Sequence, residues 1–135
     1  KNKIKKLIKN KHLEDRIILK DTSNNIKDEL LSSTLFALPS TSEGMPNALL
    51  EAMSLQLPVI TTNSTEALNS IITNNKNGII IPKNNKKILT EKIEYLLENK
   101  DIRNKLGKEA TKVKEKYNKE EIINKWDKII KEELN

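Results

Sequence analysis

Short apolar runs alternate with amphipathic stretches through the first 82 residues of the chain. The runs are rich in Ile, Leu and Val, as parallel strands buried on both faces are, and they cover residues 16–20, 35–38, 59–62 and 79–81. The segments that alternate with these runs have apolar residues at helical spacing and are predicted to be helices; they cover residues 2–13, 26–33, 46–55 and 65–73. Ser23 or Asn24 is expected to cap the second of these helices. The alternation predicts an α/β fold with an open parallel sheet of about four strands and flanking helices.

After Pro82 the apolar pattern is helical only. The residues that form the expected helix faces are Ile88, Ile93, Leu96, Leu97, Ile102, Leu106, Ala110, Val113, Ile122, Ile123, Trp126, Ile129, Ile130 and Leu134. Residues 83–135 are therefore expected to be a helical tail behind an α/β part, residues 1–82. Trp126 fits packing in a core or between domains better than stacking on a ligand. Because the chain starts with Lys1 rather than Met, we expect it to be part of a longer protein.

One stretch combines a strand, a polar loop and a helix start. The run 35–38 ends at Pro39, and Pro46 stands where the next helix is expected to begin, because proline is favoured at the first helical position. In a first helical turn the N–H groups have no intrahelical partner, and the helix dipole adds partial positive charge. The N–H groups expected to be free are those of Asn47, Ala48 and Leu49. The stretch therefore predicts a site for an anion such as a phosphate.

Two carboxylates flank this expected anion site. Glu43 lies in the loop before the helix, and Glu51 lies about five residues into the helix, or ~7 Å along its axis. Carboxylates accept hydrogen bonds from hydroxyl groups, so a ligand with a central phosphate and hydroxyls at both ends would fit. A nucleotide-diphosphate sugar has this pattern. The spacing alone is a weak motif in a chain with 14 Glu, where both residues can be solvated surface acids.

The residues around the two acids form a longer string. It reads Pro39-Ser40-x-x-Glu43-Gly44-x-Pro46-Asn47-x-Leu49-Leu50-Glu51-Ala52-Met53, followed by Leu57-Pro58-Val59-Ile60-x-Thr62. This string resembles the signature of the family-4 retaining glycosyltransferases, which are two-domain enzymes of the GT-B architecture. The resemblance implies that residues 1–135 are part of a Rossmann-like C-terminal domain that binds a nucleotide sugar, with an N-terminal acceptor domain as its partner in the same protein.

The resemblance also implies roles for the residues of the string. Glu43 would be the catalytic residue that contacts the transferred sugar, and Glu51 would contact the ribose of the nucleotide. The backbone that would hold the diphosphate belongs to Gly44, Met45, Pro46, Asn47, Ala48 and Leu49. The donor would be a nucleotide-diphosphate sugar, with no cofactor and no metal ion. The acceptor would be a glycan or a lipid-linked molecule in bacterial surface polysaccharide synthesis, and transfer would retain the anomeric configuration.

Three features depart from the family pattern. The strand at 16–20 would border the base pocket near Asp21 and Thr22, where the family usually has Gly. The loop 63–72 has no Gly, and Ser70 stands where the family usually has Glu. The basic residues that clamp the diphosphate would lie upstream of Lys1, as would the acceptor domain. We therefore expect this chain by itself to bind a donor weakly and to be inactive.

The net charge of +6 comes from basic residues that are spread along the chain. Only Lys1 to Lys11 forms a one-sided cluster, which is expected to be a solvated helix face. The alternative is attraction to an anionic membrane surface or a lipid-phosphate acceptor. One Phe, one Trp and two Tyr give few platforms for stacking bases, so no nucleic acid is expected as a partner. The chain has no Cys, and the single His12 does not make a metal site.

No apolar run approaches the ~18 residues of a membrane span, and no signal peptide is recognisable. We therefore expect a cytoplasmic protein, with a peripheral position at the inner membrane face as the alternative. One function besides sugar transfer stays open, a non-catalytic module that binds a nucleotide sugar or a partner. A basic domain that binds nucleic acid is the least favoured interpretation.

Overall fold

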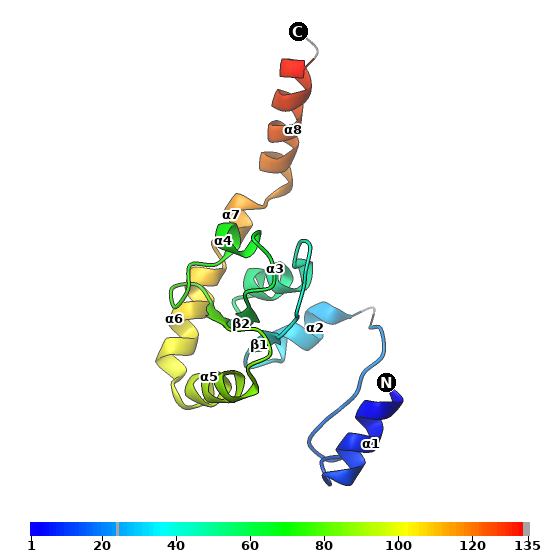
Figure 1. Cartoon of the computed structure of the whole chain (residues 1–135). Helices are drawn as coiled ribbons and strands as arrows, with labels where there is room; N and C mark the ends of the chain where they lie inside the picture. Colours follow the sequence, from blue (N-terminus) through cyan, green and yellow to red (C-terminus); the bar gives the residue numbers. More distant parts are fainter. Residues whose placement is uncertain (24, 134–135) are drawn as a thin grey trace.

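The computed structural model describes residues 1–23 and 25–133 as an α/β structure built around a parallel sheet (Figure 1). The strands lie in the order β1-β2-β3, with the bounds β1 (Phe36–Leu38), β2 (Val59–Thr62) and β3 (Ile79–Ile81). In their register, Leu38 pairs with Thr61, and Thr62 pairs with Ile81. The predicted fold class, a parallel α/β sheet with flanking helices, is confirmed.

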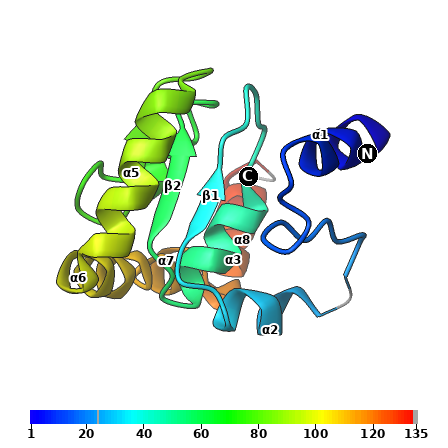
Figure 2. The ribbon, with the colours of Figure 1, turned by 90° about the horizontal axis from the view of Figure 1, so that it is seen from below.

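Helices cover both faces of the sheet, and some extend beyond it (Figures 1 and 2). The helices of the described residues are α1 (Asn2–Asn10), α2 (Ile26–Leu31), α3 (Asn47–Ser54), α4 (Leu68–Ile71), α5 (Lys86–Glu98), α6 (Lys100–Ala110), α7 (Val113–Lys116) and α8 (Lys119–Glu133). Helices α3, α4 and α7 share one hydrophobic cluster with the sheet, and α5 shares a second cluster with it. Helix α8 points away from this body, and α1 lies to one side of it (Figure 1).

The central strand β2 supplies side chains to both layers of the core. All its residues are buried, and successive side chains of a strand point to opposite faces. Val59 joins the cluster of α3, α4 and α7, whereas Ile60 joins the cluster of α5. The first cluster also contains Leu49, Ala52 and Met53, which are fully buried on α3. The predicted burial of this strand on both faces is confirmed.

Residues 16–20 do not form the strand that their apolar pattern predicts. Ile17 and Ile18 are 41% and 78% exposed, and the segment pairs with no strand among the described residues. β1 is bonded to β2 on one side, and its other edge has no neighbouring strand in the described part of the chain. A strand needs a neighbour to satisfy its N–H and C=O groups and to bury its side chains. The predicted count of about four strands is therefore wrong for the described residues, where the sheet has three.

Several helix boundaries also differ from the prediction. α1 and α4 are shorter than their patterns predict, and Pro46 precedes α3 as its N-cap instead of opening the helix. The prediction that Ser23 caps α2 is wrong, because the N-cap residue is Asn25, and Ser23 Oγ accepts from the N–H of Asn25 at 3.1 Å. Asn24, the other predicted cap, lies outside the described residues. Among the described residues, the N-cap residues of α1, α2, α3 and α4 make no side-chain hydrogen bond to the backbone of their helices, and apolar spacing by itself does not set the end of a helix.

The tail after Pro82 is helical, as predicted, and is divided into α5, α6, α7 and α8. The last helix leaves a row of apolar side chains exposed, which consists of Ile122, Ile123, Trp126, Ile129 and Ile130. Trp126 is 62% exposed, so it is not part of the core that this chain forms. Its packing between domains stays a prediction. Leu134, predicted for the same face, lies outside the described residues.

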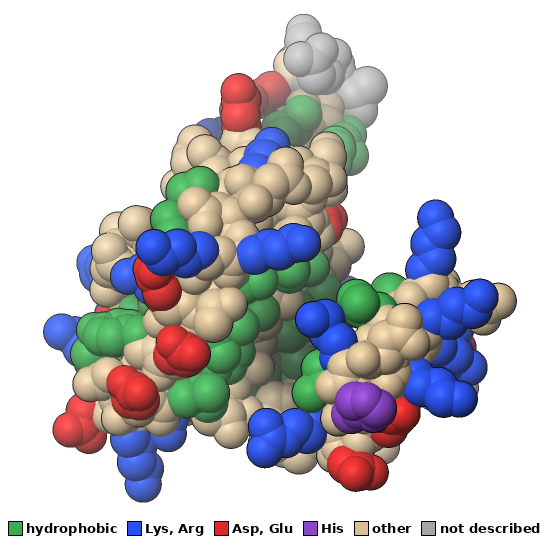
Figure 3. Space-filling model, turned by 60° about the horizontal axis from the view of Figure 1, so that its bottom comes forward, with side chains coloured by type: hydrophobic (Ala, Val, Ile, Leu, Met, Phe, Trp, Pro, Cys, Tyr) green, Lys and Arg blue, Asp and Glu red, His purple; other side chains and the backbone are tan. Residues whose placement is uncertain are grey.

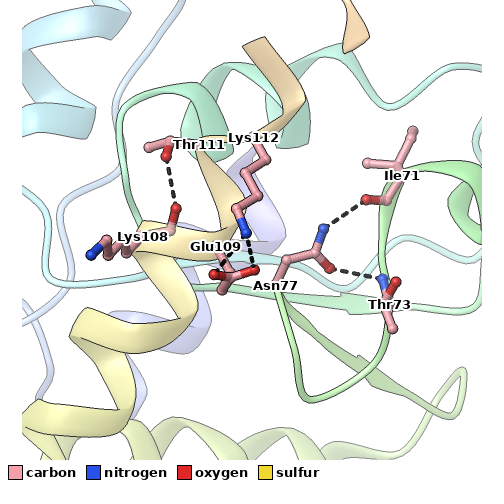
Figure 4. A network of polar contacts seen from close by, with 7 residues as sticks. All are labelled: Ile71, Thr73, Asn77, Lys108, Glu109, Thr111 and Lys112. Carbon is pink, nitrogen blue, oxygen red and sulfur yellow. Dashed lines mark hydrogen bonds and ion pairs between the residues drawn. The ribbon is translucent and has the colours of Figure 1, made fainter. Parts of the chain in front are cut away.

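Hydrogen bonds of the Asn77 side chain stabilise the turn that leads into β3 (Figure 4). The Asn77 side chain donates to Ile71 O at 3.0 Å and accepts from Thr73 N–H at 2.8 Å.

A second polar contact lies at the end of α6, where Lys112 Nζ donates to the Glu109 carboxylate at 2.8 Å. This hydrogen bond lowers the pKa of Glu109 and raises the pKa of Lys112. Because the pair is open to solvent, it contributes little to stability.

Helix α6 approaches the turn between α3 and β2 at Gly107. A Cβ atom at this position would lie 2.1 Å from the carbonyl oxygen of Gln56. Gln56 itself has a φ of 67°, in the left-handed region that is uncommon for residues other than glycine. Leu106 and Ala110, close to the contact on the same helix, are buried. The missing side chain of Gly107 therefore sets how closely α6 packs on this turn.

We predict that Gly107→Ala destabilises the chain by about 1–3 kcal/mol, the usual cost of overpacking. Alanine would favour the helix by ~1 kcal/mol, but its methyl group must displace the turn at Gln56. Urea unfolding of the variant and the wild type measures the difference. Gly44→Ala is the matched control, because a Cβ at Gly44 has no heavy atom within 4 Å. A Gly107→Ala variant as stable as the wild type would contradict the close contact.

Candidate functional site

The candidate site is the loop 39–46 together with the first turn of α3. It lies at the carboxyl end of β1, and ligands of open α/β sheets bind outside the carboxyl ends of the strands. Pro46 is fully buried and anchors the end of the loop. The exposed residues of the tip are Gly44, Met45, Asn47 and Ala48. The helix tip is therefore open to a ligand.

Of the three N–H groups predicted to be free in the first turn, two have acceptors within the chain. Asn47 N–H donates to Met45 O at 2.9 Å, and Leu49 N–H donates to Pro46 O at 3.0 Å. Ala48 N–H has no protein acceptor among the described residues. The prediction is therefore wrong for Asn47 and Leu49, because the turn at Pro46 brings carbonyl oxygens within reach of the helix start.

Gly44 has no structural role that requires glycine. Its φ is not positive, and a Cβ atom built on it meets no heavy atom within 4 Å. Neither the backbone conformation nor the packing of this chain therefore excludes a side chain at this position. What the missing side chain does provide is close access to the backbone, which a ligand at the helix tip can use.

The two acids of the motif lie in different surroundings. Glu43 is half-buried in the loop, and Glu51 is exposed on α3. Neither carboxylate has an ion pair or a hydrogen bond within the described residues. Glu51 lines a hollow of about 660 Å³, and Glu43 does not. Both carboxylates are thus available to a ligand, but only Glu51 is associated with this hollow.

The hollow beside Glu51 lies between α3 and the junction of α7 with α8. Its lining residues are Met45, Asn47, Leu50, Glu51, Ser54, Val113, Lys114, Tyr117, Asn118 and Ile122. A smaller hollow of about 300 Å³ also includes Glu51 and Ser54, and it reaches α2 at Lys27 and Leu30. The sequence did not predict that the C-terminal tail approaches Glu51, because this contact depends on tertiary packing.

Ser64 is a candidate site residue that the sequence did not single out. It follows the carboxyl end of β2, is 7% exposed, and its Oγ has no hydrogen-bond partner among the described residues. Its N–H donates to Thr62 O at 2.7 Å. A buried hydroxyl without a partner is costly, so a polar group of a ligand would stabilise it. One indication of Ser64 is present in the sequence, because this residue lies in the loop 63–72, and that loop departs from the family pattern.

The lysine-rich N-terminal segment is a separate surface feature (Figure 3). α1 exposes Ile4 and Leu7 beside its lysines. Lys1 forms an ion pair with Asp21, so this predicted neighbour of the base pocket already has a partner within the chain. In the part of the chain that the structure describes, no helix has the length and apolar character needed to cross a bilayer.

The amino-acid sequence of this chain is similar to those of known proteins. A profile of the family described as Glycosyl transferases group 1 matches residues 1–113. CapM, a capsular polysaccharide biosynthesis glycosyltransferase of Staphylococcus aureus, is 32% identical over 119 residues, which cover 88% of this chain and 28% of CapM. The poly(ribitol-phosphate) alpha-N-acetylglucosaminyltransferase of Staphylococcus aureus strain COL is 32% identical over 127 residues, which cover 93% of this chain and 26% of that enzyme. The chain thus spans less than a third of the length of these two relatives.

Solved structures of glycosyltransferases share the fold. One from Rickettsia africae ESF-5 superimposes with a TM-score of 0.92 at 26% identity, covering 99% of this chain and 36% of that protein. A mutant of Staphylococcus aureus TarM, in complex with Fondaparinux, alpha-GlcNAc-glycerol and UDP, superimposes with a TM-score of 0.87 at 31% identity, covering 93% of this chain and 26% of TarM. With the profile match over most of its length, the chain belongs to the glycosyl transferases group 1 family, and its fold is that of GT-B glycosyltransferases.

Proposed function

We propose that this chain is the donor-binding part of a family-4 retaining glycosyltransferase, which moves a sugar from a nucleotide-diphosphate sugar to a glycan or a lipid-linked acceptor. The names of CapM and the poly(ribitol-phosphate) enzyme support bacterial surface polysaccharide synthesis as its setting. The observation that carries donor binding is the open tip of α3. Residues 43–51 contain a glycine without a structural role, one N–H group without a protein acceptor and two carboxylates that have no ion pair or hydrogen bond within the described residues.

In this proposal the diphosphate lies against the backbone of Gly44 and the N–H of Ala48, where the helix dipole favours an anion. Glu43 accepts hydrogen bonds from the transferred sugar, and Glu51 accepts them from the ribose. The nucleotide then occupies a hollow beside Glu51. Because two of the first-turn N–H groups are engaged within the chain, basic residues elsewhere in the longer protein would neutralise much of the diphosphate charge.

The proposed chemistry is transfer with retention of configuration. The bond between the anomeric carbon and the β-phosphate oxygen breaks, the acceptor oxygen bonds to that carbon, and the acceptor proton passes to the departing diphosphate. We assign no enzymic nucleophile to the chain. Glu43 orients the sugar, and the tip of α3 stabilises the charge on the leaving group, which are effects of orientation and electrostatics.

Two exposed surfaces receive roles in the same proposal. The apolar row of α8 would pack against the N-terminal acceptor domain of the longer protein. The chain matches 28% of the length of CapM, which leaves room for such a domain in the longer protein. The Lys1–Lys11 segment would hold the protein near an anionic membrane surface or the phosphate of a lipid-linked acceptor. The first role rests on the exposure of the row and on the share of CapM that the chain covers, and the second rests on charge.

We predict that Glu51→Ala weakens the binding of UDP by about 1.5–3 kcal/mol, the contribution of a hydrogen bond to a charged group. Calorimetric titrations with UDP and GDP measure this loss and identify the base. Glu94→Ala is the matched control, because Glu94 is an exposed glutamate on α5 without an ion pair in the described residues. Equal affinity of the wild type and Glu51→Ala for both nucleotides would count against the ribose contact.

We predict that Gly44→Ala lowers UDP affinity without lowering stability. The free energy of unfolding should stay equal or rise by about 0.4–1 kcal/mol, because alanine restricts the unfolded chain and meets no atom in the folded one. The added methyl group would stand between the backbone and the diphosphate. Urea unfolding and calorimetry on the same samples separate the two effects. Unchanged UDP affinity would show that the diphosphate lies elsewhere.

We predict no measurable sugar transfer by the 135 residues alone, because they span less than a third of CapM. A transfer assay with radiolabelled donor compares the chain with the full-length protein. Robust turnover by the chain alone would overturn this prediction. A full-length protein that binds the donor but transfers no sugar would instead favour the alternative, a non-catalytic nucleotide-sugar or partner-binding module.

A further inference from the structure

The backbone pairing of β1 with β2 ends at Leu38 and Thr61. Pro39 follows and has no N–H group with which to continue the ladder. Two threonine hydroxyls of β2 make contacts here. Thr61 Oγ1 lies at the last paired position, 3.2 Å from its acceptor Leu38 O and 3.3 Å from Thr62 O. Beyond that position, Thr62 Oγ1 donates to Ser40 O. A side chain thus makes the contact between the two segments where the ladder has ended and the candidate site begins.

The contact made by Thr62 reaches into the loop. Among the described residues, its bond to Ser40 O is the hydrogen bond that joins residues 39–44 to the rest of the chain. Ser40 precedes Glu43 and Gly44 by a few residues in the same loop. Thr62 is 2% exposed, so water does not compete for its hydroxyl, and its branched Cβ restricts its rotamer. The contact is therefore a defined anchor at the start of the Glu43 loop.

We infer that Thr62 is a positioning residue of the donor site. Its hydroxyl fixes the start of the loop and so places Glu43 and Gly44 in front of α3. This role rests on the proposed function of the loop. Thr61 provides an internal comparison, because it is the same residue type, is equally buried, and bonds to Leu38 within the strand instead of to the loop.

¹⁵N relaxation of the backbone amides of residues 40–45 tests the anchor directly. Thr62→Val keeps the shape of the side chain and removes the donor, so the order parameters of these residues should fall toward about 0.6 or lower, the value of a flexible backbone. Thr62→Ser keeps the hydroxyl and should give the order parameters of the wild type, as should Thr61→Val. Unchanged order parameters in Thr62→Val, or an equal fall in Thr61→Val, would overturn the anchor. If Thr62→Val does not fold, Thr62→Ser against Thr62→Ala isolates the same hydroxyl.

Titration of the ¹⁵N-labelled chain with UDP, followed by NMR, tests the consequence for binding. The dissociation constant should rise about five- to ten-fold in Thr62→Val and stay within about two-fold of the wild type in Thr62→Ser and Thr61→Val. Glu51→Ala is measured in parallel. A loss of affinity in Glu51→Ala but not in Thr62→Val would overturn the positioning role alone. Equal binding by all variants, Glu51→Ala included, would overturn the donor site itself, while the order parameters would still decide whether Thr62 holds the loop.

Discussion

The packing of α3 on the sheet determines where the candidate site lies. Leu49, Ala52 and Met53 are fully buried and contribute to the cluster that α3 shares with β2 and α7. Burial of a side chain the size of Leu or Met contributes roughly 1.5–3 kcal/mol. Because Leu49 lies near the beginning of α3, the packing of these side chains in the core also fixes the position of the first turn. The opposite side of the helix, with Asn47 and Glu51, is left open. Core and candidate site are thus two sides of the same helix.

The apolar pattern predicted three of the strands and failed on a fourth for a physical reason. β2 and the segment 16–20 have similar apolar composition, but β2 has a paired strand on each side and 16–20 has none in the described residues. A pattern of side chains shows which residues favour burial, and it does not show whether a neighbouring strand is present to bury them. The exposure of Ile18 therefore reflects the surroundings of the segment and not its own preference.

The candidate site was predictable where it is local in sequence and not where it depends on tertiary contacts. The local pattern predicted that Glu43 and Gly44 lie in a loop and that Glu51 lies on the helix that follows, and the structure has them there. Whether an N–H group of the first turn stays free depends on the exact path of the chain at Pro46. The neighbours of Glu51 in the hollow include Tyr117, which is distant in sequence and is brought there by the packing of α7 on α3. Such contacts leave no signal in a local pattern.

The exposed side of α8 gives this protein an intrinsic optical reporter. Trp126 is the single tryptophan of the chain, it faces solvent, and it does not line the hollow beside Glu51. Indole fluorescence moves to shorter wavelength when the ring leaves water. The emission of the unlabelled protein therefore reports on whatever covers the last helix.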